Sequence, residues 1–126
     1  SSYRFMAPEV YLHEKYNETV DVYSYAMILF YLFVGRPPWP NLAGLDAVRK
    51  AAEEGDRPNI PRDLDLRMQN LMKECWADNR NVRPSFGVII NVLSDFSKDV
   101  YHQDSNEVAI AHSHNQTSTS CSCVIQ

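Results

Sequence analysis

Residues 20–34 read VDVYSYAMILFYLFV, and they include the longest apolar run of the chain, residues 26–34. We predict that the whole stretch forms one helix. The run is shorter than the 18 or so apolar residues that a membrane span requires, and Asp21 interrupts the stretch. A helix that is apolar on all sides is expected at the buried centre of a larger fold.

Cap and stop residues mark both ends of this helix. Asn17 and Thr19 precede it and are candidate N-caps. Gly35, followed by Pro37 and Pro38, supplies a stop signal, because glycine accepts the left-handed backbone of a helix end and proline cannot continue a helix.

Three amphipathic segments follow, and no convincing strand or internal repeat accompanies them. The first, residues 43–54, has a charged outer face and is followed by Gly55. In the second, apolar residues recur at helical spacing over residues 64–76, with Asp63 as a candidate N-cap. Ser85 opens the third, whose apolar face consists of Phe86, Ile89, Ile90, Leu93 and Phe96. These patterns predict a mainly α fold.

Periodicity disappears after Lys98, where Ser, Thr, Asn, Gln and His dominate. Such a composition cannot bury enough apolar surface to offset the entropy of ordering the chain. We therefore predict a folded part, residues 1–98, followed by a disordered polar tail, residues 99–126.

Charge and composition restrict the function. The apolar fraction of 44% and charged fraction of 22% are those of an ordinary globular domain. Residues 1–98 carry all 12 Lys and Arg and 13 of the 16 Asp and Glu. The tail contains the other three acidic residues and no Lys or Arg. Without a basic stripe to neutralise phosphates, nucleic-acid binding is not expected, and a polybasic membrane patch is absent too.

The cysteines and the first residues indicate the cellular context. Cys75 lies in a helical pattern far from Cys121 and Cys123, so no disulfide framework is expected. This favours a reducing, cytoplasmic compartment. The chain begins SSYR without Met or an apolar leader, which we interpret as the truncated start of a longer protein. The four histidines have no further ligands at useful spacing, so no metal site is predicted.

Three separated motifs occur in an order typical of one family. Residues 2–9, SYRFMAPE, resemble the end of a kinase activation segment, which closes with Ala-Pro-Glu. Residues 21–26, DVYSYA, are similar to the start of that family's central buried helix. The Cys-Trp at residues 75–76 and the RPSF at residues 83–86 resemble elements near the end of the domain. The chain thus resembles the C-terminal, large-lobe part of a eukaryotic-type protein kinase domain.

The residues of these motifs resemble those of the tyrosine-kinase-like group of serine/threonine kinases. That group has a Thr or Ser seven residues before the Glu of Ala-Pro-Glu, and Ser2 occupies this position here. The resemblance implies that Ser2 helps to seat the substrate hydroxyl. The chain departs from the usual pattern at Ser1, Tyr23 and Ala26, where the group often has Gly, Trp and Gly.

The resemblance also implies roles for three charged residues. Glu9 and Arg83 are expected to form a buried, bidentate ion pair that attaches the segment to the last helices, the alternative being two unrelated surface charges. Asp21 is expected to support the backbone of the catalytic loop. Its alternative is a solvent-facing carboxylate in the first turn of a helix, favoured by the helix dipole.

Several parts of a kinase are missing from these residues. Phosphoryl transfer uses a Gly-rich loop, a strand lysine, a catalytic aspartate, and an Asn and an Asp for magnesium, and none of these motifs occurs here. We expect no catalytic residue in this chain, and no ATP binding or catalysis by it alone. The parent protein is expected to be a serine/threonine kinase that uses ATP and Mg²⁺ on protein substrates. A pseudokinase that serves as a protein-binding scaffold is the alternative.

The final four residues, CVIQ, have the form that prenyltransferases recognise, and a terminal Gln favours a farnesyl group on Cys123. A single lipid binds membranes weakly, and Cys121 is a candidate for a second, palmitoyl group. This hypothesis predicts peripheral association with the cytoplasmic face of a membrane. The alternative is an unmodified polar tail.

Overall fold

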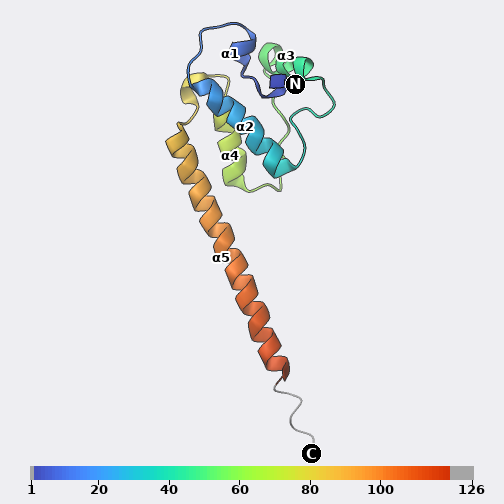
Figure 1. Cartoon of the computed structure of the whole chain (residues 1–126), viewed down its shortest axis with the longest axis vertical. Coiled ribbons are helices and arrows are strands. Elements are labelled where there is room, and N and C mark those ends of the chain that lie inside the picture. The colour runs from blue at the N-terminus through green and yellow to red at the C-terminus, as the bar shows by residue number, and fades with distance from the viewer. Residues whose placement is uncertain (1, 120–126) are drawn as a thin grey trace, which may run out of the picture. The chain divides into compact units, whose positions relative to one another are not determined.

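The computed structural model describes residues 2–119, with only the backbone described at residues 112 and 114–119. Within this range the chain is helical and has no strand, which confirms the predicted mainly α fold (Figure 1). The elements in chain order are η1 (Ser2–Phe5), α1 (Pro8–Tyr11), α2 (Thr19–Val34), α3 (Gly44–Glu54), α4 (Leu66–Cys75), η2 (Arg80–Val82) and α5 (Phe86–Thr119).

The core of the fold is built on α2. This helix packs against α4, and it also contacts η1 and η2, while α3 packs against η1 and α1 (Figure 1). The buried face of α2 is formed by Val22, Tyr23, Ala26, Met27, Leu29 and Phe30. Burial of this apolar surface is the main favourable contribution to folding.

The other face of α2 remains exposed, which refines the expectation of a helix buried all round. Ile28 and Tyr31 are each 46% exposed, and Leu32 is 70% exposed. The reason is the helical period of 3.6 residues, which turns these side chains away from α4. Within residues 2–90, no element covers them. The exposed apolar surface is consistent with the expectation that α2 belongs to something larger.

Local signals define the helix ends largely as predicted. The predicted N-cap of α2 is wrong, because the N-cap is Glu18, which makes no side-chain cap hydrogen bond, and Thr19 is the first helical residue. The Oδ1 atom of Asn17 accepts hydrogen bonds from the backbone N and the Oγ1 of Thr19. Gly35 ends α2 as predicted, with φ of 77°. Gly55 ends α3 in the same left-handed conformation, with φ of 65°. The side chain of Ser85 accepts a hydrogen bond from the backbone of Val88 at the start of α5. These contacts satisfy backbone groups that a helix end leaves without partners.

The predicted N-cap of α4 is wrong by two residues. Asp65, rather than Asp63, accepts the backbone N–H of Arg67 through its side chain. Asp65 also pairs with the Arg67 guanidinium, and this interaction is the first of the causes that lower the pKa of Asp65 below 3.8. Both aspartates precede the apolar pattern, so the periodicity alone did not distinguish them.

The structure also corrects the predicted tail. Residues 99–119 were expected to be disordered, but they continue α5 as helix to Thr119. The chain contains no Gly or Pro after Gly87, so no residue interrupts the helical hydrogen bonds. A polar composition argues against a buried core but not against a helix, whose backbone bonds are local. Residues 120–126 lie outside the described part of the chain.

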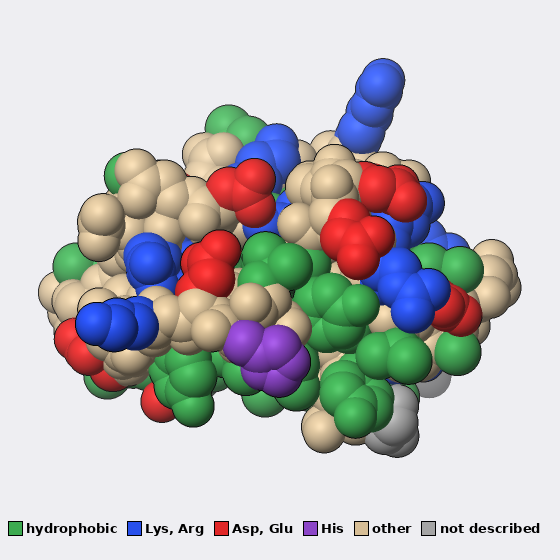
Figure 2. All heavy atoms as spheres, turned by 90° about the horizontal axis from the view of Figure 1, so that it is seen from above, with side chains coloured by type: hydrophobic (Ala, Val, Ile, Leu, Met, Phe, Trp, Pro, Cys, Tyr) green, Lys and Arg blue, Asp and Glu red, His purple; other side chains and the backbone are tan. Residues whose placement is uncertain are grey.

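Residues up to Ile90 form one compact unit, and residues from Asn91 onward form a second. On the face shown in Figure 2, Lys and Arg side chains are interspersed with Asp and Glu side chains, and hydrophobic side chains lie between them. In the described range 2–119, no helix combines the length and the apolar character needed to cross a membrane.

Candidate functional site

The site of interest is the set of contacts that hold residues 2–9 within the first compact unit. These residues form η1, a short turn and the start of α1. Pro8 begins α1, where its missing N–H costs nothing, and Ala7 is only 1% exposed. The local sequence therefore places the carboxylate of Glu9 in the first turn of a short helix whose start is buried.

Glu9 and Arg83 form the predicted ion pair. The Nη1 of Arg83 lies 2.6 Å from Oε1 of Glu9, and its Nη2 lies 3.1 Å from Oε2. The side chain of Arg83 is completely buried, and that of Glu9 is 7% exposed. The two parallel hydrogen bonds give the pair a defined orientation as well as charge compensation. The alternative of two unrelated surface charges is therefore excluded.

Arg83 also binds two backbone carbonyl groups. Its Nε donates to the Ala77 carbonyl over 2.9 Å, and its Nη1 donates to the Thr19 carbonyl over 3.1 Å. One side chain thus connects α1, the start of α2 and the loop after α4. A buried guanidinium requires such partners, because an unpaired buried charge is costly.

Tyr23 fills the space between two arginines. The guanidinium carbons of Arg57 and Arg83 each lie 5.2 Å from the centroid of the Tyr23 ring, within the range of cation–π attraction. Its hydroxyl group is buried and has no hydrogen-bond partner in the described part of the chain. Burial raises the pKa of Tyr23 to about 12, so the ring remains neutral at physiological pH.

The environment of Glu9 makes the stability of the fold depend on pH in the acidic range. Burial by itself would raise the pKa of Glu9, but the hydrogen bond from Arg83, a backbone hydrogen bond, and the charges of Arg83 and Arg80 hold it below the ordinary value of 4.5. A group with a lowered pKa in the folded state stabilises the fold above its unfolded pKa. This contribution is lost as the pH falls through the lowered folded value.

We therefore expect the free energy of unfolding to decrease below about pH 4.5, and the Glu9→Gln variant to show a shallower decrease in that range. Urea denaturation of both proteins between about pH 7 and pH 3 measures the difference. Glu74→Gln, which changes an acidic residue outside the ion pair, serves as the control. Parallel pH profiles for Glu9→Gln and the unsubstituted protein would contradict this assignment.

Two further contacts hold residues 2–9, and sequence reasoning missed both. Arg4 donates from Nη1 to the carbonyls of Pro38 and Trp39, over 2.9 and 3.2 Å, and from Nη2 to the carbonyl of Leu42, over 3.0 Å. Ser24 in α2 donates through Oγ to the Phe5 carbonyl over 2.8 Å. An arginine that binds distant backbone carbonyls leaves no pattern in a single sequence, so no signal for Arg4 was available.

The remaining predicted residues are placed as follows. Ser2 lies in η1 and is exposed. Asp21 is exposed in the first turn of α2, which agrees with its solvent-facing alternative in this chain. Cys121 and Cys123 lie outside the described residues, so their lipidation stays a prediction. Cys75 is buried, and burial raises the pKa of its thiol to about 12, so it is not a reactive thiolate.

The chemistry available at this site is anchoring. In residues 2–119, no three His, Cys, Asp or Glu side chains lie close enough to hold a metal ion. The ionisable groups around Tyr23 are paired with one another or with backbone carbonyls. The site therefore holds residues 2–9 in one conformation, with the Ser2 side chain at the surface.

Comparison with known proteins agrees with the predicted resemblance to a protein kinase domain. The sequence model of the family described as "Protein tyrosine and serine/threonine kinase" matches residues 1–93. Serine/threonine-protein kinase STY17 of Arabidopsis thaliana is 36% identical over 99 residues, which are 79% of this chain and 17% of that protein. Serine/threonine-protein kinase VIK of the same plant is 41% identical over 93 residues, which are 73% of this chain and 21% of that protein.

A relative described as a dual specificity protein kinase also matches. This protein, pyk3 of Dictyostelium discoideum, is 38% identical over 90 residues, which are 71% of this chain and 7% of that protein. The chain spans only a quarter or less of the length of the curated relatives to which we compared it.

Proposed function

The chain belongs to the protein tyrosine and serine/threonine kinase family, and from this membership we propose that the whole protein is an ATP-dependent serine/threonine kinase. In this proposal residues 1–98 form the platform on which a protein substrate lies. The relatives STY17 and VIK are described as serine/threonine kinases, which supports this choice over tyrosine specificity.

The observation that carries the proposal is the attachment of residues 2–9. The buried Glu9–Arg83 pair fixes one end of this segment, and Arg4 and Ser24 hold its middle through backbone carbonyls. Ser2 is thereby presented at the surface at the start of the segment. Catalysis by positioning requires such rigidity, because small displacements of the substrate hydroxyl reduce the rate strongly.

ATP and Mg²⁺ would be bound by other parts of the protein. The chain contains none of the motifs that hold phosphates or magnesium, so this platform supplies no ligand to them. The exposed apolar face of α2, with Ile28, Tyr31 and Leu32, supports a larger domain in which other elements cover this helix. Asp21, exposed at the start of α2, would then hold the catalytic loop.

The test uses the protein extended by the coding sequence upstream of Ser1. We expect magnesium-dependent phosphorylation of Ser and Thr peptides from a degenerate library, with little transfer to the matched Tyr peptides. Ser2→Thr should keep most of kcat/KM, because the hydroxyl group remains, and Ser2→Ala should reduce it by about tenfold to a hundredfold. Ser94→Ala is the control, because it removes an exposed hydroxyl outside the segment.

Three outcomes would contradict the proposal. Equal phosphorylation of Tyr peptides would remove the Ser/Thr specificity. Equal activity of Ser2→Ala and the unsubstituted enzyme would remove the role of Ser2. An upstream sequence without the lysine, aspartate and asparagine of the family would identify the protein as a scaffold without phosphoryl transfer.

A further inference from the structure

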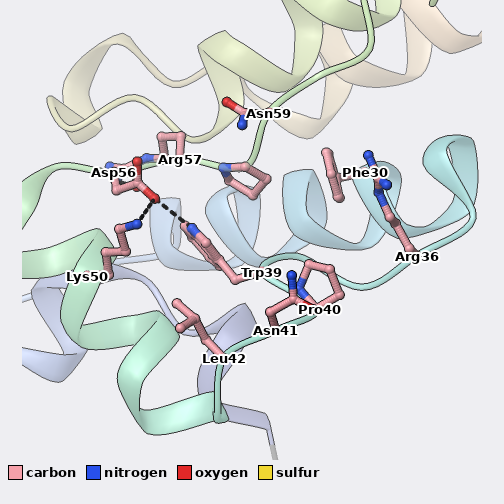
Figure 3. A pocket seen from close by; sticks show the side chains of 11 residues that line it. Phe30, Arg36, Trp39, Pro40, Asn41, Leu42, Lys50, Asp56, Arg57 and Asn59 are labelled. Carbon is pink, nitrogen blue, oxygen red and sulfur yellow. Dashed lines mark hydrogen bonds and ion pairs between the residues drawn. The ribbon is translucent and has the colours of Figure 1, made fainter.

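A second feature of the first compact unit is a pocket of about 460 Å³, a volume within the range of small-ligand sites. It lies between the end of α2, the loop that carries Trp39, the helix α3 and the segment that follows Gly55 (Figure 3). The anchoring of residues 2–9 uses none of the side chains that line it.

The loop that carries Trp39 is held in a constrained conformation. Trp39 has φ of 46°, a left-handed backbone that bulky residues rarely adopt. The indole Nε1 donates to Oδ2 of Asp56 over 2.7 Å, and the same carboxylate lies 3.6 Å from Nζ of Lys50. Arg4 also holds the loop, through hydrogen bonds to the carbonyls of Pro38, Trp39 and Leu42. Residues kept in strained conformations cluster at ligand sites, which makes this pocket a preformed one.

The two ends of the pocket differ in their charge balance. At one end Asp56 is compensated by Lys50, and in Figure 3 Arg36 and Phe30 lie at the opposite end with Trp39 between. The guanidinium of Arg57 already has four partners. It donates hydrogen bonds to the Asp78 carboxylate and to the backbone carbonyls of Ala51, Asp56 and Trp76. Arg36 is exposed and makes no hydrogen bond or ion pair within residues 2–119.

Lys50 is paired with Asp56 and Arg57 with Asp78, so the lining retains one uncompensated positive charge, that of Arg36. A cationic ligand would be repelled by this excess, whereas an anion would find the uncompensated guanidinium of Arg36 and the side-chain amides of Asn41 and Asn59. The rings of Phe30 and Trp39 and the nearby Pro40 add an apolar wall.

We propose that this pocket binds an acidic peptide segment of a partner protein, with a carboxylate on Arg36 and the adjoining apolar side chain against Trp39 and Pro40. A peptide fits because it presents the anionic and the apolar group side by side, as the two parts of the lining require. The site is independent of phosphoryl transfer, so its test does not depend on the proposed kinase activity.

Titration calorimetry of the chain tests this proposal with three probes. The first is a short blocked peptide with a Leu-Glu-Glu centre, the second is its Leu-Gln-Gln analogue, and the third is inorganic phosphate. We expect the acidic peptide to bind, with an affinity that falls as salt increases, and the amide analogue to bind at least about tenfold more weakly. Arg36→Gln should weaken the binding of the acidic peptide by a similar factor.

Arg49→Gln is the matched control, because Arg49 is an exposed arginine of α3 outside the pocket that pairs with Asp46. It should leave the affinity within about twofold, and circular dichroism of each variant checks that the helices are retained. If Arg36→Gln and Arg49→Gln weakened peptide binding equally, the binding would depend on the overall charge of the chain rather than on Arg36, which would contradict the proposal. Equal binding of the two peptides, binding of phosphate alone, or no binding of the acidic peptide up to about 1 mM would each overturn the proposal.

Discussion

Arg83→Ala is expected to lower the free energy of unfolding by about 3 to 5 kcal/mol, because it leaves the buried carboxylate of Glu9 without its partner. The carbonyls of Ala77 and Thr19 lose a donor in the same variant. Such a loss is a large share of the stability of an ordinary domain. Urea denaturation followed by far-ultraviolet circular dichroism measures it.

The controls separate the geometry of this pair from its charge. Arg83→Lys keeps a positive charge but cannot form both hydrogen bonds to Glu9, so an intermediate loss is expected. Arg49→Ala removes an exposed arginine that pairs with Asp46 and interacts with Tyr11, and it should cost less than about 1 kcal/mol. If Arg83→Ala cost no more than Arg49→Ala, the buried pair would not be the anchor described above.

Trp76→Ala is expected to be as damaging as the loss of Arg83, at about 3 to 5 kcal/mol, because it opens a cavity in the core. Trp76 follows α4 directly, is 5% exposed, and its ring lies 6.3 Å from that of Phe30 in α2. The contact therefore joins the two helices that form the centre of the fold. Thermal unfolding followed by circular dichroism reports the loss without relying on tryptophan fluorescence.

Two companion variants test whether packing is the cause. Trp76→Phe retains an aromatic ring against Phe30 and should lose clearly less stability than Trp76→Ala. Leu66→Ala removes a side chain that is 66% exposed, and it should change the free energy of unfolding by less than about 0.5 kcal/mol. A loss for Leu66→Ala equal to that for Trp76→Ala would show that the core assignment is wrong.

The contacts of Arg4 connect the site at residues 2–9 with the pocket. Arg4 lies between Ser2 and Glu9, and its carbonyl partners lie in the loop whose Trp39 lines the pocket. The same loop thus accepts the hydrogen bonds of Arg4 and contributes to the pocket lining. Its conformation matters for both features.

Much of the fold could be predicted from local pattern. The apolar run of residues 20–34, the glycines at 35 and 55, and Ser85 are signals that act over a few residues, and the observed helices follow them closely. The Glu9–Arg83 pair was predicted from the resemblance to a kinase rather than from spacing. Family resemblance can carry such a contact across 74 positions of sequence, whereas periodicity cannot.

The sequence by itself determined the class of fold, the order of its helices and the Glu9–Arg83 pair, because these depend on short-range propensity and on recognisable motifs. Only the tertiary structure decided which face of α2 is buried, that Arg4 binds a loop 34 to 38 residues away, and that Arg36 lies uncompensated in a pocket. The physical reason is that burial and charge compensation depend on neighbours in space. Such neighbours are set by how the helices pack, and a single sequence does not record that packing.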